Sequence, residues 1–337
     1  MSVINRRWVL ASRPDGQPTL ENFRLEEQEL PDLGAHEVLI HAHYFSVDPG
    51  MRSRLSSDSY AAALKEGELI EGAMVGVVQS SNNEKFAAGD LVTGGFGWQE
   101  YAISNGRGVA KLNGALFQPP LTVTTAIGIL GIPGLTSYFG LLDLGKPQEG
   151  NTVLISSAAG PVGATAGQIA KLKGCRAVGI AGSQAKCDYV VKELGFDACI
   201  NYKEVDDLQA AIATHCPDKV DIYFDNVGGE MLDAAILNMN EKGRLIISGA
   251  VSEYNKAEPR GIRNTLQFIT HRLRMEGLVV YDYFKRFPEA QAEMAGWIST
   301  GRLKFTEDIS EGIEGAPAAF IGLFEGENHG RRLIKVS

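Results

Sequence analysis

The chain has 337 residues, of which 44% are apolar and 22% are charged, so it is long enough for two globular domains of ordinary composition. Its formal net charge of −9 argues against binding to nucleic acid or to an anionic membrane surface. No apolar run is long enough to span a bilayer, and Arg6-Arg7 lacks the apolar segment that completes a twin-arginine signal. We therefore expect a cytoplasmic protein whose four cysteines are reduced, since none is spaced as Cys-x-x-Cys.

The first 120 or so residues predict a compact β-rich domain. Short β-prone runs at 38–44, 73–78 and 91–93 are bounded by glycine, proline and acidic turns, and no helices alternate with them. Two buried helices are expected next, over 124–132 and 135–142, with Pro133 and Gly134 between them.

From residue 152 the pattern becomes a regular alternation of strands and helices. The predicted strands are 152–156, 177–181, 198–201, 221–225, 244–249 and 275–280, and the helices are 164–173, 186–194, 205–214, 230–239 and 263–271. Strands joined by crossover helices predict a doubly wound parallel sheet of Rossmann type. A helix at 288–301 is expected to be the last, before strands that return to the β-rich domain. The expected domains are 1–125, 126–300 and the returning 301–337.

The turn after the first of these strands carries the glycine pattern of a dinucleotide site. Residues 158–163 read AAGPVG, which is G-x-G-x-x-G with alanine first. Gly160 lets backbone N–H groups approach a pyrophosphate, and Gly163 lets the helix pack closely on the strand. Ala158, Gly160, Val162 and Gly163 are the candidate contacts, and a tight strand–helix turn without a ligand is the alternative.

The end of the second sheet strand favours NADP over NAD. An NAD site places a carboxylate about 20 residues past the glycines, and here Gly182-Ser183 carries none. Ser183 and Lys186 supply a hydroxyl and a cation, and Tyr202 and Lys203 supply a second pair. The alternative for either lysine is an ordinary solvated side chain.

Several short segments, taken together, resemble one family across nearly the whole chain. They are 46–52 (SVDPGMR), 134–138 (GLTSY), 158–163 (AAGPVG), 224–229 (FDNVGG) and 280–284 (VYDYF). The chain resembles the medium-chain dehydrogenase/reductase superfamily, in the zinc-independent branch of NADPH-dependent alkenal and prostaglandin/leukotriene reductases with bacterial curcumin-reductase-like members. The resemblance implies an α/β fold with a GroES-like catalytic domain beside the Rossmann domain, and a homodimer built through the nucleotide domains.

The resemblance also accounts for missing metal ligands. Zinc-dependent members carry a cysteine near residue 47 and a Gly-His-Glu further on, and this chain has neither. His41 and His43 stand on a predicted strand with no cysteine nearby, so we expect no metal site. Reduction of an enone C=C bond suits such a site, because hydrogen-bond donors can stabilise the enolate and a tyrosine or water can protonate it.

The candidate site residues follow from position and resemblance. Tyr254 comes after the fifth sheet strand and Tyr60 lies in the loop after 48–52, where the family has substrate-contacting tyrosines. Further candidate cofactor contacts are Gly182, Asn226, Val227, Gly249, Leu278 and Asn328. The family often has lysine where this chain has Arg331, which makes an equivalent contact less certain. Arg52 either meets a substrate carboxylate or a cofactor phosphate, or forms an internal salt bridge.

Two other functions remain open from the sequence. One is a zinc-free quinone reductase of the same superfamily, which the tyrosines at 60 and 254 disfavour mildly. The other is an NADPH-binding protein that has lost catalysis, which intact cofactor residues alone do not exclude.

Overall fold

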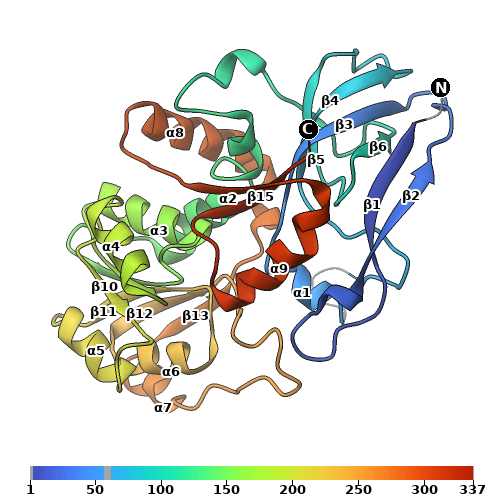
Figure 1. The fold of residues 1–337 in the computed structure, drawn as a ribbon. Coiled ribbons are helices and arrows are strands. Elements are labelled where there is room, and N and C mark those ends of the chain that lie inside the picture. The colour runs from blue at the N-terminus through green and yellow to red at the C-terminus, as the bar shows by residue number, and fades with distance from the viewer. Residues whose placement is uncertain (1–2, 57–61, 337) are drawn as a thin grey trace. The chain divides into compact units, whose positions relative to one another are not determined.

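The computed structural model describes residues 3–56 and 62–336 and divides the chain into two compact units (Figure 1). The first unit holds Met1–Gly128 together with Glu307–Ser337, and the second holds Ile129–Thr306. The end of the chain therefore belongs to the same unit as its beginning.

The first unit is built on a mostly antiparallel sheet of seven strands. The strand order is β14-β15-β3-β4-β5-β7, and β6 also pairs with β3. Trp98 is fully buried at the centre of its core, with the rings of Phe23, Phe45 and Phe320 around it. The strands of this unit are β1 (Ile4–Leu10) and β2 (Phe23–Glu29), which form a separate pair, then β3 (Val38–Ser46), β4 (Met74–Ser81), β5 (Leu91–Gly94), β6 (Tyr101–Ser104), β7 (Ala110–Lys111), β14 (Glu307–Glu311) and β15 (Arg331–Lys335).

The second unit contains the predicted doubly wound sheet. Its six strands are all parallel, in the order β10-β9-β8-β11-β12-β13. All five residues of β8 are buried, as expected for a strand covered on both faces. The strands are β8 (Thr152–Ser156), β9 (Arg176–Ala181), β10 (Ala198–Asn201), β11 (Val220–Asp225), β12 (Met239–Ile247) and β13 (Arg274–Gly277). The order reverses between β8 and β11, and ligands bind such sheets at the carboxyl end of that point.

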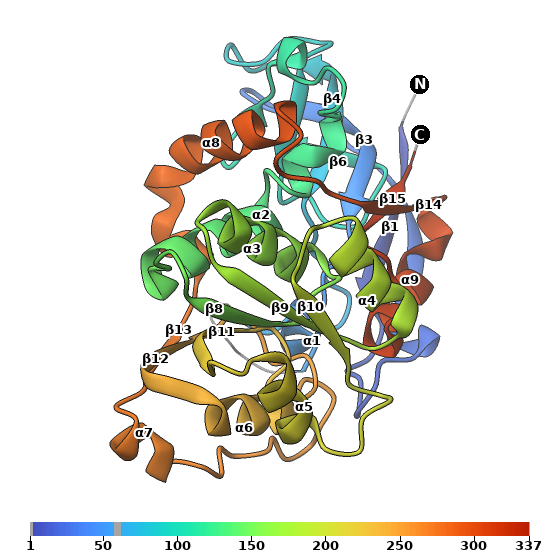
Figure 2. The same ribbon diagram turned by 90° about the vertical axis from the view of Figure 1, so that its left-hand side faces the viewer.

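Helices cover both faces of this sheet. Figures 1 and 2 show α3 on one face and α5 and α6 on the other. Within the described residues, no helix is both long and apolar enough to cross a membrane. The helices of this unit are α2 (Ile132–Phe139), α3 (Pro161–Leu172), α4 (Gln184–Lys192), α5 (Leu208–His215), α6 (Gly229–Leu237), α7 (Leu266–Thr270) and α8 (Phe287–Ser299).

The prediction that Pro133 separates two buried helices is wrong. A short 3₁₀ helix at Val123–Ile127 replaces the first, and α2 begins at Ile132 with Pro133 in its first turn. Proline fits there because the first N–H groups of a helix have no intrahelical acceptor. A π-helix at Gly140–Gly145 continues α2.

The prediction that the helix near 288–301 is the last is also wrong. The first unit contains α1 (Met51–Arg54) and a longer helix, α9 (Ala316–Glu325), between β14 and β15. Strands alone were expected in this segment, and Pro317 is accommodated in the first turn of α9, where the N–H groups have no intrahelical acceptor. Its buried face, which includes Ala319 and Phe320, packs into the core around Trp98.

Candidate cofactor and active site

Close backbone contacts shape the turn between β8 and α3. Ser157 has a φ of 52°, in the left-handed region, and its carbonyl accepts the Gly160 N–H at 3.0 Å. A Cβ on Gly163 would lie 2.3 Å from the same carbonyl oxygen, so only glycine lets α3 begin this close to the strand. Ala158, which replaces the first glycine of the pattern, is fully buried, so its methyl group is part of the core.

The N-terminus of α3 presents backbone donors beside this turn. Pro161 has no N–H, and the N–H of Ala164 donates to the Gly160 carbonyl at 2.8 Å. The N–H groups of Val162 and Gly163 therefore have no acceptor within the helix. Together with the positive end of the helix dipole, they form the kind of site that binds a phosphate.

The end of β9 brings together residues from two strands and a helix. A Cβ on Gly182 would lie 3.2 Å from the ring of Tyr202 and 3.5 Å from Cε of Lys203. The Ser183 hydroxyl caps α4 by accepting the backbone N–H of Lys186 at 3.3 Å. The Tyr202 ring and the Lys203 side chain thus lie beside Gly182, and Ser183 and Lys186 begin the helix that follows. The residues of β9 itself carry no carboxylate.

Asp225, at the carboxyl end of β11, organises the turn that follows it. Its Oδ1 accepts the hydroxyls of Tyr223 at 2.9 Å and Ser156 at 3.0 Å, and the N–H groups of Val227 and Gly228 at 3.0 Å each. Its Oδ2 is buried and has no hydrogen-bond partner in the part of the chain that the structure describes. Burial raises the pKa of Asp225 in spite of these bonds.

The remaining cofactor candidates of this unit lie along the same edge of the sheet. Asn226 is fixed to β8, because its N–H donates to the Ser156 hydroxyl and its side-chain amide to the Ser156 carbonyl, both at 2.8 Å. Gly249 follows β12, and its N–H donates to the Asp225 carbonyl at 3.1 Å. Leu278 follows β13 directly. These residues follow three neighbouring parallel strands, so they meet at one carboxyl edge.

The structure places the hydroxyl of Tyr254 over the end of β12. This hydroxyl accepts the N–H of Ala250 at 3.2 Å, and a Cβ on Gly249 would lie 3.3 Å from its oxygen. Gly249 is also close to Asn226, whose carbonyl oxygen would lie 3.1 Å from the same Cβ. The predicted tyrosine is therefore next to two predicted cofactor contacts, Gly249 just before it in sequence and Asn226 on the neighbouring strand end.

Asp225 and Ser156 were not among the residues predicted from the sequence. Both are polar residues at the last position of a buried strand, and their side chains hydrogen-bond each other. An acid followed by asparagine and two glycines at a strand end was the available signal, and Gly228 and Gly229 indeed have φ of 73° and 60°.

Asn328, Arg331 and Arg52 belong to the first unit. The candidate Tyr60 lies outside the residues that the structure describes. The Asn328 side-chain amide donates to the Gly330 carbonyl at 2.9 Å. Arg331 is buried, donates to the Ile127 carbonyl and pairs with Asp48. Burial favours the neutral form of Asp48, yet Arg331 holds the pKa of that carboxyl below its ordinary value. Arg331 therefore serves as an internal counter-ion in its own unit.

Arg52 is also held inside the first unit. Its guanidinium donates to the Ser56 hydroxyl and to the Gly16 carbonyl, at 2.6 Å each, and burial lowers the pKa of Arg52. Both of these acceptors are uncharged.

The histidines on β3 pack as aromatic rings. His41 stacks on Tyr101 with ring centroids 4.6 Å apart, and burial together with His41 lowers the pKa of His43. Across residues 3–56 and 62–336, no group of three or more histidine, cysteine, aspartate or glutamate side chains is arranged to hold a metal ion.

Two family models match the chain. Residues 6–112 match the N-terminal domain of oxidoreductase, and residues 161–296 match the domain named zinc-binding dehydrogenase. The second name covers the nucleotide-binding half of the chain, and the full sequence lacks the Gly-His-Glu ligands of zinc-dependent members.

Individual relatives match over almost their whole length. An NADPH-dependent curcumin reductase of Escherichia coli is 43% identical, with 99% of this chain and 97% of the relative covered. Prostaglandin reductase 1 of Rattus norvegicus is 43% identical, with 98% of each chain covered. The crystal structure of CurA from Vibrio vulnificus in complex with NADPH matches with a TM-score of 0.93 at 39% identity, covering 98% of this chain and 99% of that one.

Proposed function

This chain belongs to the medium-chain dehydrogenase/reductase superfamily, in its zinc-independent curcumin and prostaglandin reductase branch, and we propose that it reduces the C=C bond of α,β-unsaturated ketones and aldehydes with NADPH. The observation that carries the proposal is the Tyr254 hydroxyl at the carboxyl edge of the sheet, next to the turn at Asn226. A hydrogen-bond donor beside a nicotinamide suits a reaction that develops negative charge on a carbonyl oxygen.

Two features of the second unit support binding of NADPH. The start of α3 offers two N–H groups for a pyrophosphate, and the end of β9 offers Ser183, Lys186 and Tyr202 for a 2′-phosphate. Bound NADPH supplies a hydride to the β-carbon of the substrate. The residues assigned to its nicotinamide end are Asn226, Val227, Gly249 and Leu278. The family resemblance implies Asn328 as a further cofactor contact.

Tyr254 then acts on the carbonyl oxygen of the substrate. Its hydroxyl accepts the Ala250 N–H, and a hydroxyl that accepts a hydrogen bond becomes a stronger donor of its own proton. Donation to the developing enolate lowers the barrier, and the same hydroxyl or a water delivers the proton that completes the reaction. We assign Tyr60 a second contact with the substrate by resemblance.

Loss of NADPH absorbance with a panel of substrates tests this function. The panel holds an alkenal, a cyclic enone, an aryl enone and a quinone, and NADH runs in parallel. We expect turnover of the enones and a preference for NADPH. Turnover of the quinone alone supports the quinone reductase alternative, and tight NADPH binding without turnover supports a non-catalytic protein.

The assigned 2′-phosphate site makes a separate prediction. Replacing Lys186 by alanine is expected to raise the KM for NADPH about tenfold, since a bond to a charged group contributes about 1.5–3 kcal/mol. The KM for NADH should stay unchanged, because NADH has no 2′-phosphate. Lys192→Ala is the control, since Lys192 is on the same helix and pairs with Asp188 at the surface. Equal changes in KM for NADPH and NADH would contradict the assignment.

We also propose that the chain forms a homodimer through β13. This strand is an edge of the sheet, and all four of its residues are exposed. An exposed edge carries unpaired backbone groups that favour pairing with another strand. Antiparallel pairing of two copies centred on Met275 would set Arg274 of each copy opposite Glu276 of the other. Exposed large hydrophobic residues surround this strand in sequence, at Leu266, Ile269, Val279 and Phe284.

The dimer proposal predicts a rescue by charge exchange. Light scattering should give twice the chain mass of 36.3 kDa for the wild type. Arg274→Glu sets like charges opposite each other, so we expect its dimer dissociation constant to rise about tenfold or more. Exchanging both charges, as Arg274→Glu with Glu276→Arg, should restore the dimer. A monomeric wild type, or a double variant as weak as the single one, would contradict the arrangement.

We place the protein in the cytoplasm. The reaction consumes NADPH, and all four cysteines are free thiols, which suits a reducing compartment.

A further inference from the structure

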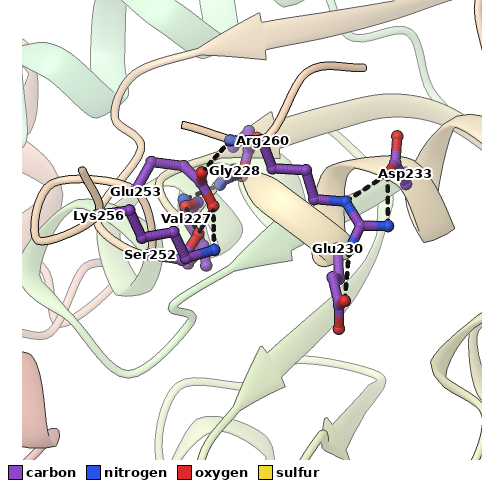
Figure 3. Close-up of polar contacts among 9 residues, drawn as sticks. Val227, Gly228, Glu230, Asp233, Ser252, Glu253, Lys256 and Arg260 are labelled. Atoms are coloured by element: carbon purple, nitrogen blue, oxygen red, sulfur yellow. Dashed lines mark hydrogen bonds and ion pairs between the residues drawn. The ribbon is translucent and has the colours of Figure 1, made fainter. Parts of the chain in front are cut away.

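The loop that carries Tyr254 is held by a glutamate that the reaction above does not use (Figure 3). Oε1 of Glu253 accepts the Ser252 hydroxyl at 3.0 Å and the Lys256 ammonium at 2.8 Å, and its Oε2 accepts the Arg260 N–H at 2.6 Å. The side chain is only 10% exposed. Burial alone would raise the pKa of Glu253, and these bonds hold it below its ordinary value, so the group stays a carboxylate at neutral pH.

Arg260 extends this contact to α6. Its Nε and Nη2 donate to Oδ2 of Asp233 at 3.1 Å each, and its Nη1 pairs with Glu230 (Figure 3). The other oxygen of Asp233 accepts the N–H of Arg263 at 3.0 Å. The far end of the loop is therefore fixed to the helix that follows the Asp225 turn.

The near end of the loop rests on the same turn. The N–H of Ser252 donates to the Val227 carbonyl at 3.0 Å. The single proton of the Ser252 hydroxyl is shared between the same carbonyl, at 2.7 Å, and Oε1 of Glu253, at 3.0 Å. Gly229 has a φ of 60°, and a Cβ on it would lie 2.6 Å from Oε1 of Glu253. Glu253 thus connects Ser252 at the near end of the loop with Arg260 at its far end. It also lies against the turn after Asp225, which carries the assigned cofactor contacts Asn226 and Val227.

We propose that Glu253 is a positioning residue for Tyr254: it closes the loop between Ser252 and Arg260 and so fixes the tyrosine hydroxyl over the end of β12. The proposal rests on the function proposed above. The segment between β12 and α7 contains no regular helix or strand, so these contacts define its path. Position matters because a displacement of about 1 Å at a reacting group can lower a rate about 10²-fold.

Two substitutions at Glu253 and one control test the proposal. Glu253→Ala is expected to lower kcat for an enone about tenfold while the dissociation constant for NADPH changes less than about twofold. The kcat of Glu253→Gln should lie between those of Glu253→Ala and the wild type. The oxygen of the glutamine amide can still accept from Ser252 and Lys256, but its NH₂ group faces the Arg260 N–H as a second donor. Glu258→Gln, an exposed change in the same loop, should leave kcat unchanged.

Glu253→Ala in a Tyr254→Phe background distinguishes positioning of the Tyr254 hydroxyl from a structural role that does not involve this hydroxyl. If Glu253 acts through the tyrosine hydroxyl, Glu253→Ala should lower kcat less than about twofold once that hydroxyl is gone. The same tenfold loss in both backgrounds would overturn the proposal. If Glu253→Ala does not fold, Glu253→Gln serves in the same comparison.

Hydrogen exchange of peptides covering residues 249–263 gives a readout that does not depend on turnover. Glu253→Ala should speed exchange there relative to the wild type and to Glu258→Gln. If the wild type reduces no enone but Glu253→Ala still exchanges faster, the proposed function is wrong. The anchoring of the Tyr254 loop by Glu253 is then still supported. If the wild type reduces enones and Glu253→Ala has the same kcat and the same exchange rate as the wild type, only the positioning role of Glu253 is wrong.

Discussion

A Tyr254→Phe variant is expected to lower kcat for enone reduction about 10²-fold while its dissociation constant for NADPH changes less than about twofold. The hydroxyl sits at the carboxyl edge of the sheet, where it accepts the Ala250 N–H. Phenylalanine keeps the ring and removes only the donor, so the loss falls on the step in which negative charge develops on the substrate. Steady-state kinetics and a fluorescence titration with NADPH measure the two quantities.

Tyr189→Phe is the matched control for this variant. It also removes a tyrosine hydroxyl that has a partner, since the Tyr189 and Thr306 hydroxyls are 2.6 Å apart. Tyr189 is on α4 and is none of the assigned cofactor or substrate contacts, so we expect only a stability cost of about 1 kcal/mol. If Tyr254→Phe has the same kcat as Tyr189→Phe, the Tyr254 hydroxyl takes no part in the reaction.

A Gly163→Ala variant is expected to raise the dissociation constant for NADPH about 10²-fold or more and to lower the melting temperature. The new Cβ would lie 2.3 Å from the Ser157 carbonyl oxygen and 2.9 Å from Cα of Ala158, and both are backbone atoms that cannot rotate away. Relieving this overlap costs about 1–3 kcal/mol and moves the start of α3. The move also displaces the N–H groups of Val162 and Gly163, each worth about 1.5–3 kcal/mol when bonded to a charged phosphate.

Gly296→Ala supplies the same chemical change where there is room for it. Gly296 is exposed within α8, and an added Cβ would have no neighbour within 4 Å. Alanine favours a helix interior by about 1 kcal/mol over glycine, so this variant should be slightly more stable and bind NADPH normally. Normal NADPH binding by Gly163→Ala, measured by the same titration, would contradict the assignment of the α3 turn.

The sequence predicted the nucleotide-binding half well because its signals are local. A strand covered on both faces is rich in apolar residues, as β8 is with Val153, Leu154 and Ile155 at its centre. The glycines that let a helix start close to this strand follow within a few residues. Residues that follow β9, β11 and β12, such as Gly182, Asn226 and Gly249, could be named as soon as the strands were placed. Parallel strands bring their carboxyl ends to one edge, however far apart they are in sequence.

Other errors and omissions come from contacts that no local pattern encodes. Helix α9 is stabilised by packing of Phe320 on Trp98, a residue more than 200 positions away, and no local pattern encodes this contact in the segment where strands were expected. The role of Glu253 depends on Arg260 and Asp233, which meet only after α6 and the loop have folded together. The sequence left open whether Arg331 contacts the cofactor, and the structure buries it beside Asp48 as an internal partner.

Transfer of label from NADPH deuterated at the transferring position of C4 tests the central claim most directly. The enzyme is mixed with an aryl enone in ordinary water, and the product is identified by NMR and mass spectrometry. We predict the saturated ketone with deuterium on the β-carbon and a solvent hydrogen on the α-carbon. An allylic alcohol with deuterium on the former carbonyl carbon, or recovery of the unchanged enone, would contradict the claim.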